Sequence, residues 1–437
     1  MGLMLAARST DARELAFFVE NRLGADSNVF RRAEETQVDE IKPKAGMVWE
    51  ITPRITLRDN RDEHGYEFRY QPTYERFFAV EDGGGGEDFS GVDHVASANY
   101  LWRMNPATSV GITGRLDRQR RIREGFLDQG FVADPPIERT DNDYIQALVG
   151  SLFLNHALSP QLSIQASYRF DDLDVSRQDS SDSRANTVSG GIFYGLTEYT
   201  RAGVRATYRQ RATKASVDPD GNPNTGPPND PTLGLREFRS ETDTFDISFS
   251  VSQQVTPRLA VDVGFGPSFF NTRDEDSLGN VSYSGDGSFF ASAGVMRDWR
   301  RGTAEVRYTR SEGGGAGATS AASILDRVTA ALYWNPARNW GVRVRGSFIH
   351  RVSVASDAFF GRDTRNDFYS AGASVERRLT EEVWVIASFR YSWSRLDGYT
   401  PFVPVLGGFL TDFETSSTTE TIEGFVALRY AFDPYVF

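Results

Sequence analysis

Apolar and polar residues alternate along short stretches of this chain. In LSIQASYRFD, residues 162–171, one face of an extended strand would carry Leu162, Ile164, Ala166, Tyr168 and Phe170. The other face would carry Ser163, Gln165, Ser167, Arg169 and Asp171. The same period of two recurs at 110–119, 204–209, 245–252, 328–334 and 342–348, and no helical period is sustained. The pattern predicts half-apolar strands, whose apolar face meets a protein core in a sandwich or lipid in a membrane barrel.

The connections between these strands fall into two alternating kinds. Short turns are expected at 105–107, 158–161, 196–199, 255–258, 299–302, 335–339 and 379–382, with a longer eighth connection at 53–65. Long polar segments are expected at 26–37, 79–91, 121–142, 176–185, 214–240, 274–286, 313–321, 354–365 and 397–417. Eight short and nine long connections predict eighteen strands. Strict alternation is typical of outer-membrane barrels, whose extracellular loops are long and whose periplasmic turns are short.

We therefore predict an all-β fold, a transmembrane antiparallel up-and-down β-barrel in the bacterial outer membrane. Residues 1–13 are expected to form a short periplasmic lead, since they do not resemble a secretory signal, and residues 14–437 the barrel. The 27-residue segment 214–240 is the best candidate for a loop that folds inward and narrows the pore.

Tryptophan positions support the membrane interpretation. Indole collects at membrane interfaces, and six of the seven tryptophans lie close to the expected short connections. We predict a periplasmic aromatic girdle made of Trp49, Trp102, Trp299, Trp334 and Trp340. Trp384 is out of phase with Val383 and Val385, so it either points inward or marks a bulge.

Composition narrows the class further. The 437 residues have a mean hydropathy of -0.44 and no apolar run near the roughly 18 residues that a spanning helix needs. Zero cysteines fits an envelope protein better than a disulfide framework, and the net charge of -12 argues against a nucleic-acid partner. Among 48 basic residues only Lys42, Lys44 and Lys214 are lysines, so nearly every cation is a planar arginine fork.

The end of the chain carries a candidate assembly signal. GFVALRYAF, residues 424–432, is an amphipathic last strand that resembles the C-terminal signal of bacterial outer-membrane proteins. The candidate residues are Tyr430, Phe432 and the terminal Phe437. The expected partners are therefore outer-membrane lipid and the barrel assembly machinery.

Three stretches are similar to a known family. DSNVFR at 26–31, YEFRYQPTYERF at 66–77 and the closing LRYAF resemble the β-barrel porin 2 family, and the resemblance would span nearly the whole chain. It implies an outer-membrane barrel, and some members are thought to give an exopolysaccharide a path across that membrane. The long connection expected at 53–65 departs from the family's short turn.

Catalytic chemistry is not expected. His64, His94, His156 and His350 lie on different segments without metal-ligand spacing. His350 is three residues from Ser347, which places the two side chains on opposite faces of a strand and argues against an esterase. We predict a protein that is not an enzyme and has no cofactor or metal.

The inward face is the candidate site. The predicted pore-lining residues are Arg115, Arg169, Arg205, Arg209, Arg307, Arg343, Arg345, Arg390, Asp117 and Asp171, and the same phase adds Arg429, Asp246, Asp262 and Glu305. They either pair across strands and stiffen a wet interior, or form a basic track for anionic solutes.

The connection at 53–65 is the candidate docking surface. Its charged residues are Arg58, Asp59, Arg61, Asp62 and Glu63, and the alternative is that it extends the strands below the membrane. We expect a passive conduit for a secreted exopolysaccharide, with a polysaccharide export protein, periplasmic or in the outer membrane, as a further partner. The alternative is a general diffusion porin for small solutes, and an outer-membrane enzyme or adhesion platform ranks below both.

Overall fold

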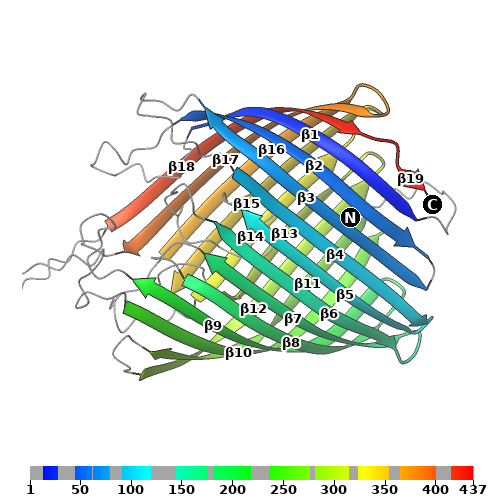
Figure 1. Ribbon diagram of the computed structural model, residues 1–437. Coiled ribbons are helices and arrows are strands. Elements are labelled where there is room, and N and C mark those ends of the chain that lie inside the picture. Colours follow the sequence, from blue (N-terminus) through cyan, green and yellow to red (C-terminus); the bar gives the residue numbers. More distant parts are fainter. Residues whose placement is uncertain are drawn as a thin grey trace, which may run out of the picture.

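A computed structural model of the chain shows one closed antiparallel sheet (Figure 1). It describes residues 13–27, 45–61, 63–78, 91–119, 144–175, 181–217, 236–275, 281–313, 323–353, 365–399 and 415–436. Each of the strands β1 to β17 pairs with the next along the chain, and β1 also pairs with β18, with Phe18 opposite Ala431 and Asp26 opposite Glu423. The pairing of the first and last long strands closes the barrel.

Eighteen strands make the wall, and a nineteenth short strand is added at its rim. Their bounds are β1 Glu14–Asp26, β2 Gly46–Asn60, β3 His64–Phe78, β4 Gly91–Asn105, β5 Thr108–Gln119, β6 Ile145–Ala157, β7 Leu162–Val175, β8 Ser181–Gly195, β9 Thr200–Val217, β10 Arg236–Thr256, β11 Leu259–Glu275, β12 Val281–Trp299, β13 Gly302–Gly313, β14 Ser323–Trp334, β15 Trp340–Ser353, β16 Arg365–Arg378, β17 Val383–Tyr399, β18 Thr415–Ala431 and β19 Tyr435–Val436. β19 pairs with the first two residues of β1. The predicted all-β barrel of eighteen strands is confirmed.

The short connections lie together at one end of the barrel, where β1 begins and β18 ends (Figure 1). They are residues 61–63, 106–107, 158–161, 196–199, 257–258, 300–301, 335–339 and 379–382. At the other end, two of the segments that we expected to be long leave only residues 176–180 and 276–280 between strands. The flanking strands extend further than the sequence pattern indicated. The alternation of the two kinds of connection is confirmed, although these two are shorter than predicted.

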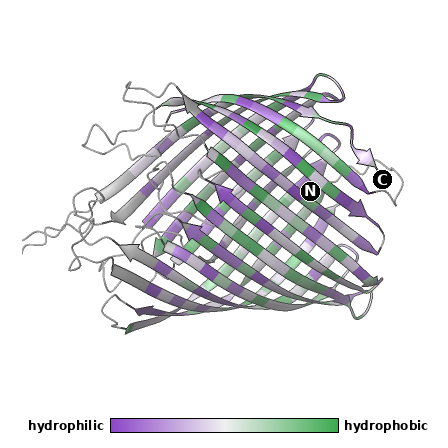
Figure 2. Cartoon of the chain, in the orientation of Figure 1, coloured by the Kyte–Doolittle hydropathy of each residue, from purple (hydrophilic) through white to green (hydrophobic). Residues whose placement is uncertain are grey.

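Apolar side chains cover the outside of the wall and polar side chains its inside. Phe249 and Tyr168, both of the predicted lipid face, are 46% and 42% exposed. On the opposite face, Ser167 Oγ lies 2.7 Å from Ser189 Oγ on the neighbouring strand. Figure 2 shows the resulting alternation of hydrophilic and hydrophobic residues along single strands. In the described part of the chain, no helix is long and apolar enough to cross a membrane.

The eighth connection is not long, which corrects our prediction for residues 53–65. Most of this segment is strand: β2 continues to Asn60 and β3 begins at His64. Pro53 suggested a turn because prolines mark other turns of this chain, but here it lies inside β2. The β2–β3 register passes from Ile51 opposite Tyr74 directly to Ile55 opposite Tyr70, so the ladder is interrupted around Pro53.

Side chains bridge this interruption. Thr52 Oγ1 donates to Thr73 Oγ1 at 3.0 Å, and Arg54 Nε donates to Gln71 Oε1 at 2.8 Å. These inward hydrogen bonds join the two strands where the main chain does not. The connection is therefore a short turn.

Candidate functional site

The predicted pore-lining residues share the inward face, and many form ion pairs within one strand. Arg115 donates from Nε to Asp117 at 2.7 Å, and Arg169 donates from Nη2 to Asp171 at 2.6 Å. Both pairs join residues two positions apart, which a strand places side by side on one face. Asp117 is completely buried beneath its arginine. The alternation in the sequence therefore brought each arginine next to its own carboxylate.

Other predicted arginines pair with carboxylates of other strands. Arg307 lies 3.3 Å from Glu305 on its own strand and 3.7 Å from Asp262 on β11, two strands away. Arg343 lies 3.3 Å from Glu376, and Arg390 lies 3.3 Å from Glu423. The sequence analysis did not single out Glu376 or Glu423. They occupy inward positions of their strands, but the register that places Glu423 opposite Arg390 and Glu376 diagonal to Arg343 cannot be read from a single strand.

A third group of predicted arginines contacts uncharged groups. Arg205 donates to Gln165 Oε1 at 3.2 Å and lies over the ring of Phe193, and Arg209 donates to Thr187 Oγ1 at 3.2 Å. Arg345 donates to the hydroxyl of Tyr333 at 2.6 Å. The interior thus holds arginines that pair with carboxylates and arginines that contact uncharged groups. The role of these arginines as pore-lining residues stays a prediction.

An ion-pair network on the inner wall joins the first and last strands. Arg429 of β18 lies 2.7 Å from Glu20 of β1, and Arg22 lies 2.9 Å from Glu50 of β2. A cavity of about 230 Å³ lies beside this network. Glu20, Arg22 and Glu50 were missed from the sequence, although their alternation with apolar neighbours was a usable signal.

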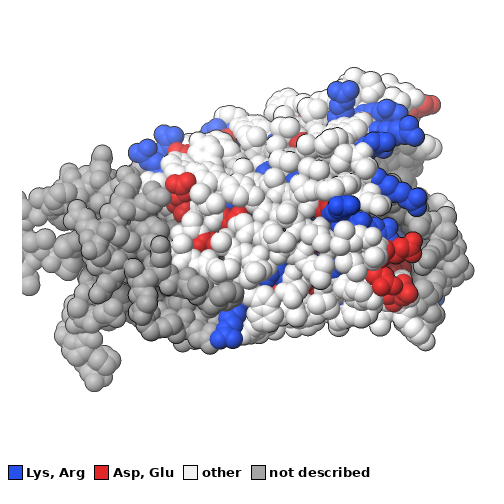
Figure 3. Space-filling model, turned by 90° about the horizontal axis from the view of Figure 1, so that it is seen from above, with Lys and Arg blue, Asp and Glu red and all other residues white. Residues whose placement is uncertain are grey.

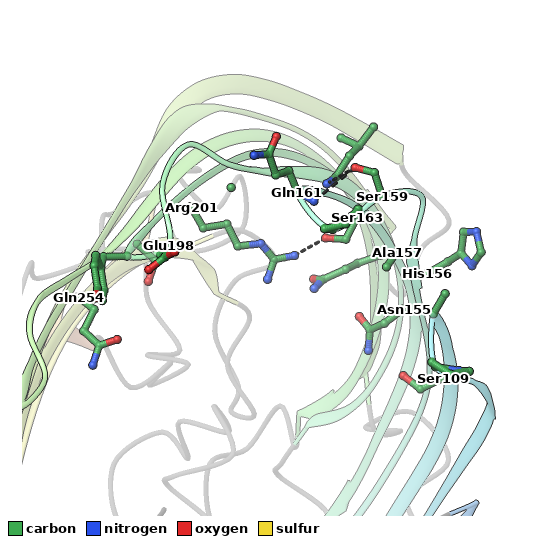
Figure 4. Close-up of a pocket in the computed structure, with 18 of the residues that line it drawn as sticks. Ser109, Asn155, His156, Ala157, Ser159, Gln161, Ser163, Glu198, Arg201 and Gln254 are labelled. Atoms are coloured by element: carbon green, nitrogen blue, oxygen red, sulfur yellow. Dashed lines mark hydrogen bonds between the residues drawn. The ribbon is translucent and has the colours of Figure 1, made fainter.

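A wide cavity opens at the end of the barrel that carries the short turns. It has a volume of about 1350 Å³, and β4 to β12 contribute to its lining. In Figure 4 the side chains of Asn155, Ser163, Arg201 and Gln254 point into it, whereas His156 points away. Arg201 Nη2 donates to Ser163 Oγ across this wall.

We call this cavity the vestibule. Its charged residues balance, with three acidic and three basic residues in the lining: Glu63, Glu198, Asp298, Arg103, Arg201 and Arg258. Uncharged hydrogen-bonding side chains make up much of the rest, among them Asn105, Thr108, Ser109, Asn155, Gln161, Ser163, Gln165, Thr200, Ser252 and Gln254. The site is suited to contacting a hydroxyl-rich molecule through many weak hydrogen bonds. The sequence analysis missed it, because its residues come from turns and strand ends far apart in the chain.

The candidate docking residues do not form an extended exposed segment, which corrects that part of the prediction. Arg58 and Asp59 belong to β2, and Asp59 is only 3% exposed. Arg58 Nη2 lies 2.6 Å from Glu14, and Arg61 Nη2 lies 3.0 Å from Asp59. Arg61 and Glu63 are exposed, and Asp62 lies outside the described residues. The alternative that we considered, an extension of the strands, describes this segment.

Four of the five predicted girdle tryptophans lie at the end with the short turns. Trp102 and Trp299 precede turns, whereas Trp334 and Trp340 flank one turn. The prediction is wrong for Trp49, which lies near the start of β2 and so at the opposite rim. There its Nε1 donates to Asn21 Oδ1 at 2.7 Å. The error has the same origin as the misplaced connection at Pro53.

Trp384 points inward rather than marking a bulge. It lies opposite Arg429 in the register, and the guanidinium of Arg378 lies 5.4 Å from the centre of its ring. The inward cation therefore packs against an indole that the alternation had already placed out of phase with the lipid face.

The candidate assembly signal lies at the seam of the barrel. Tyr430 donates from its hydroxyl to Glu382 Oε2 at 3.0 Å, and the ring of Phe432 lies 4.9 Å from that of Phe17. Phe437 lies outside the described residues. A role for these residues in recognition by the assembly machinery stays a prediction.

The histidines are held by neighbouring strands. Tyr100, Tyr70, Thr108 and Asp367 lie within hydrogen-bond distance of His64, His94, His156 and His350, respectively. Within the described ranges, no group of three or more His, Cys, Asp or Glu side chains could hold a metal ion. Of the candidate constriction at 214–240, residues 218–235 lie outside the described part, and the rest belongs to β9 and β10.

A closed barrel with an apolar outer surface and a polar interior defines the class of this protein. Each of the eighteen wall strands, β1 to β18, is paired on both sides, so the described wall leaves no unpaired edge to lipid. The protein is an outer-membrane β-barrel, and the predicted location is confirmed.

Comparisons with known proteins add likeness of fold. No protein family model and no curated protein matches the chain. Among solved structures it is similar to the FrpB iron transporter from Neisseria meningitidis, with a TM-score of 0.45, 8% identity and coverage of 95% of this chain and 81% of that one. It is also similar to the siderophore receptor PiuA from Acinetobacter baumannii, with a TM-score of 0.44, 10% identity and coverage of 95% and 82%. These likenesses are too distant to say what the chain carries.

Proposed function

We propose that this barrel is a passive conduit through which a secreted exopolysaccharide crosses the outer membrane. The vestibule is the observation that carries the proposal. Its lining is rich in amides and hydroxyls, and its acidic and basic residues are equal in number. Such a surface offers a sugar chain many hydrogen bonds of modest strength. Passage through a pore requires contacts that are favourable enough for entry and weak enough for release.

The size and position of the vestibule support the same proposal. It lies at the periplasmic end, where a polymer made inside the cell would enter. Its volume of about 1350 Å³ exceeds the range of roughly 300 to 1,000 Å³ that is usual for small-molecule pockets. The resemblance of DSNVFR and LRYAF to the β-barrel porin 2 family, some of whose members are linked to exopolysaccharide export, points the same way. An export protein would contact the rim, where Arg61 and Glu63 are exposed.

A general diffusion porin for small solutes is the second candidate. The ion pairs of the inner face favour it, because Arg115, Arg169 and Arg307 are each close to a carboxylate and leave a wet interior without a marked preference. A cell without the barrel would lose secretion of the polymer if the first function holds, and uptake of small solutes if the second holds.

The test is a deletion strain that makes the polymer. We expect secretion to stop and polymer to accumulate in the periplasm, and the intact gene to restore secretion. A triple variant with Asn155→Leu, Gln165→Leu and Gln254→Leu should reach the outer membrane but fail to restore secretion, because it removes three amides from the vestibule. The matched control with Asn155→Gln, Gln165→Asn and Gln254→Asn should restore it. Unchanged secretion in the deletion strain, with slower entry of small sugars, would overturn export in favour of a diffusion porin.

A further inference from the structure

Basic side chains gather at the periplasmic end of the outer surface. Figure 3 shows several Lys and Arg side chains at this end of the barrel, together with a smaller number of Asp and Glu side chains, beside a band with few charges. The turns there contain Arg300, Arg301 and Arg338, and the adjoining strand ends add the outward Arg297 and Arg377. This arrangement contrasts with the interior, where most of the predicted arginines approach a carboxylate.

Two of these arginines flank a cavity on the lipid side of the wall. The cavity has a volume of about 360 Å³ and is lined by Ala337, Arg338, Asn339, Trp340, Arg377, Arg378 and Leu379. Its wall is fixed by main-chain contacts, because Arg378 N donates to Asn339 O at 2.8 Å and Trp340 N donates to Ala337 O at 3.2 Å. The two turns at 335–339 and 379–382 therefore hold it open together.

The arginines of this cavity differ in what they contact. Arg378 donates through Nε and Nη2 to the carbonyl oxygens of Thr380 and Glu381, so it stabilises its own turn. Arg377 instead lies over the ring of Trp340, at 5.2 Å from the ring centre. Among the described residues, the side chains of Arg338 and Arg377 make no hydrogen bond or ion pair. Both are exposed and free to bind an anion.

The position of the cavity relative to the membrane indicates which anion could reach these arginines. Trp334 and Trp340 are 43% and 39% exposed on the lipid face, and indoles mark the membrane interface. The next outward residues toward the membrane interior are apolar and exposed, including Val344 and Val375. A lipid in this position would place its head group in the cavity and its acyl chains along these valines. Paired arginine forks match the geometry of a phosphate.

We propose that this cavity binds an anionic phospholipid of the periplasmic leaflet through its phosphate, with Arg338 and Arg377 as the ligands and Trp340 as the platform. The proposal is independent of the cargo. The site anchors the β14–β17 side of the barrel at a fixed depth and is available whatever the pore carries.

The experiment is native mass spectrometry of the full folded barrel offered phosphatidylglycerol or phosphatidylethanolamine at equal concentration. We expect phosphatidylglycerol to be retained in preference. The double variant Arg338→Gln, Arg377→Gln should weaken its retention roughly thirtyfold, since each basic residue near an anionic surface contributes about 1 kcal/mol. The variant Arg338→Lys, Arg377→Lys keeps both charges and should fall between the two, because it loses the planar forks.

The matched control is Arg103→Gln, Arg258→Gln. It removes the same charge at the same end of the barrel, but from the vestibule. It should retain phosphatidylglycerol as the wild type does, and an equal loss in this control would reduce the effect to net charge and overturn the site. Equal retention of the two lipids, or unchanged retention by the double glutamine variant, would also overturn it. Displacement by an excess of inorganic phosphate would show a site for the free anion instead of a lipid.

Discussion

A cation placed on the lipid face provides the sharpest test of the two faces. Phe249 lies near the middle of the outward apolar stretch of β10, and its ring centre is 6.0 Å from that of Phe265 on β11. Phe249→Arg would put a guanidinium toward hydrocarbon, which costs roughly 2 to 4 kcal/mol near the midplane of a barrel. Loss of the ring contact adds about 1 kcal/mol. We expect the free energy of unfolding to fall by about 3 to 5 kcal/mol.

The assay is urea-dependent unfolding in phosphatidylcholine vesicles, followed by tryptophan fluorescence and by heat-modifiable gel mobility. Ser248→Arg is the matched control, because it introduces the same side chain one position away on the inward face. Ser248 lies opposite Arg205, so repulsion between two hydrated cations should cost less than about 1 kcal/mol. Equal losses for Phe249→Arg and Ser248→Arg would show that our assignment of the faces is wrong.

Four further outcomes follow from the described contacts. Tyr168→Arg should cost about 2 to 4 kcal/mol more than Ser167→Arg in the same assay, since Tyr168 lies near the middle of β7 on the lipid face and loses its hydroxyl bond to Asn186. Gly266→Ala should lower the free energy of unfolding by about 1 to 3 kcal/mol, because its Cβ would overlap the carbonyl oxygen of Ile247, whereas Gly190→Ala meets open space and should be neutral. Asp59→Asn should lower it by about 1 kcal/mol at most, because the two arginines that pair with Asp59, Arg61 and Arg13, are half-exposed and stay hydrated, and a loss of several kcal/mol would contradict this. If the inward arginines set the field of the pore, reversal potentials in a salt gradient should show anion preference that falls when Arg205, Arg209, Arg343 and Arg345 are neutralised together, whereas pairing with carboxylates predicts an unchanged potential.

The strands of the barrel wall were predictable from the sequence, because the alternation of apolar and polar residues that defines them is a local pattern. Each strand alternates between lipid and water, so a few neighbouring residues such as Leu162, Ser163 and Ile164 already show the period. The regular alternation of long and short connections then distinguished a membrane barrel from a soluble sandwich. Neither inference needs the identity of a residue's partner on another strand.

The error at Pro53 shows where local reasoning fails. A proline marks a turn when no strand compensates for its missing N–H group, as at Pro257 between β10 and β11. In β2 the neighbouring strand compensates through Thr73 and Gln71, which bond to Thr52 and Arg54. Those partners lie about twenty residues away, at positions that only the register defines. The same misplaced turn moved Trp49 to the wrong rim.

The chemistry of the arginines depends on the same long-range information. Arg429 is neutralised by Glu20, 409 residues away in the sequence, because the closing pair of strands places them together. Arg377 has no such carboxylate, although it too stands in an alternating strand with acidic residues nearby, such as Glu376. Glu376 faces inward and pairs with Arg343 of the neighbouring strand β15. Arg377, the next residue of β16, faces outward, where that carboxylate cannot reach it. Alternation thus decides which medium each arginine meets, and closure of the barrel decides which arginines remain free to bind a ligand.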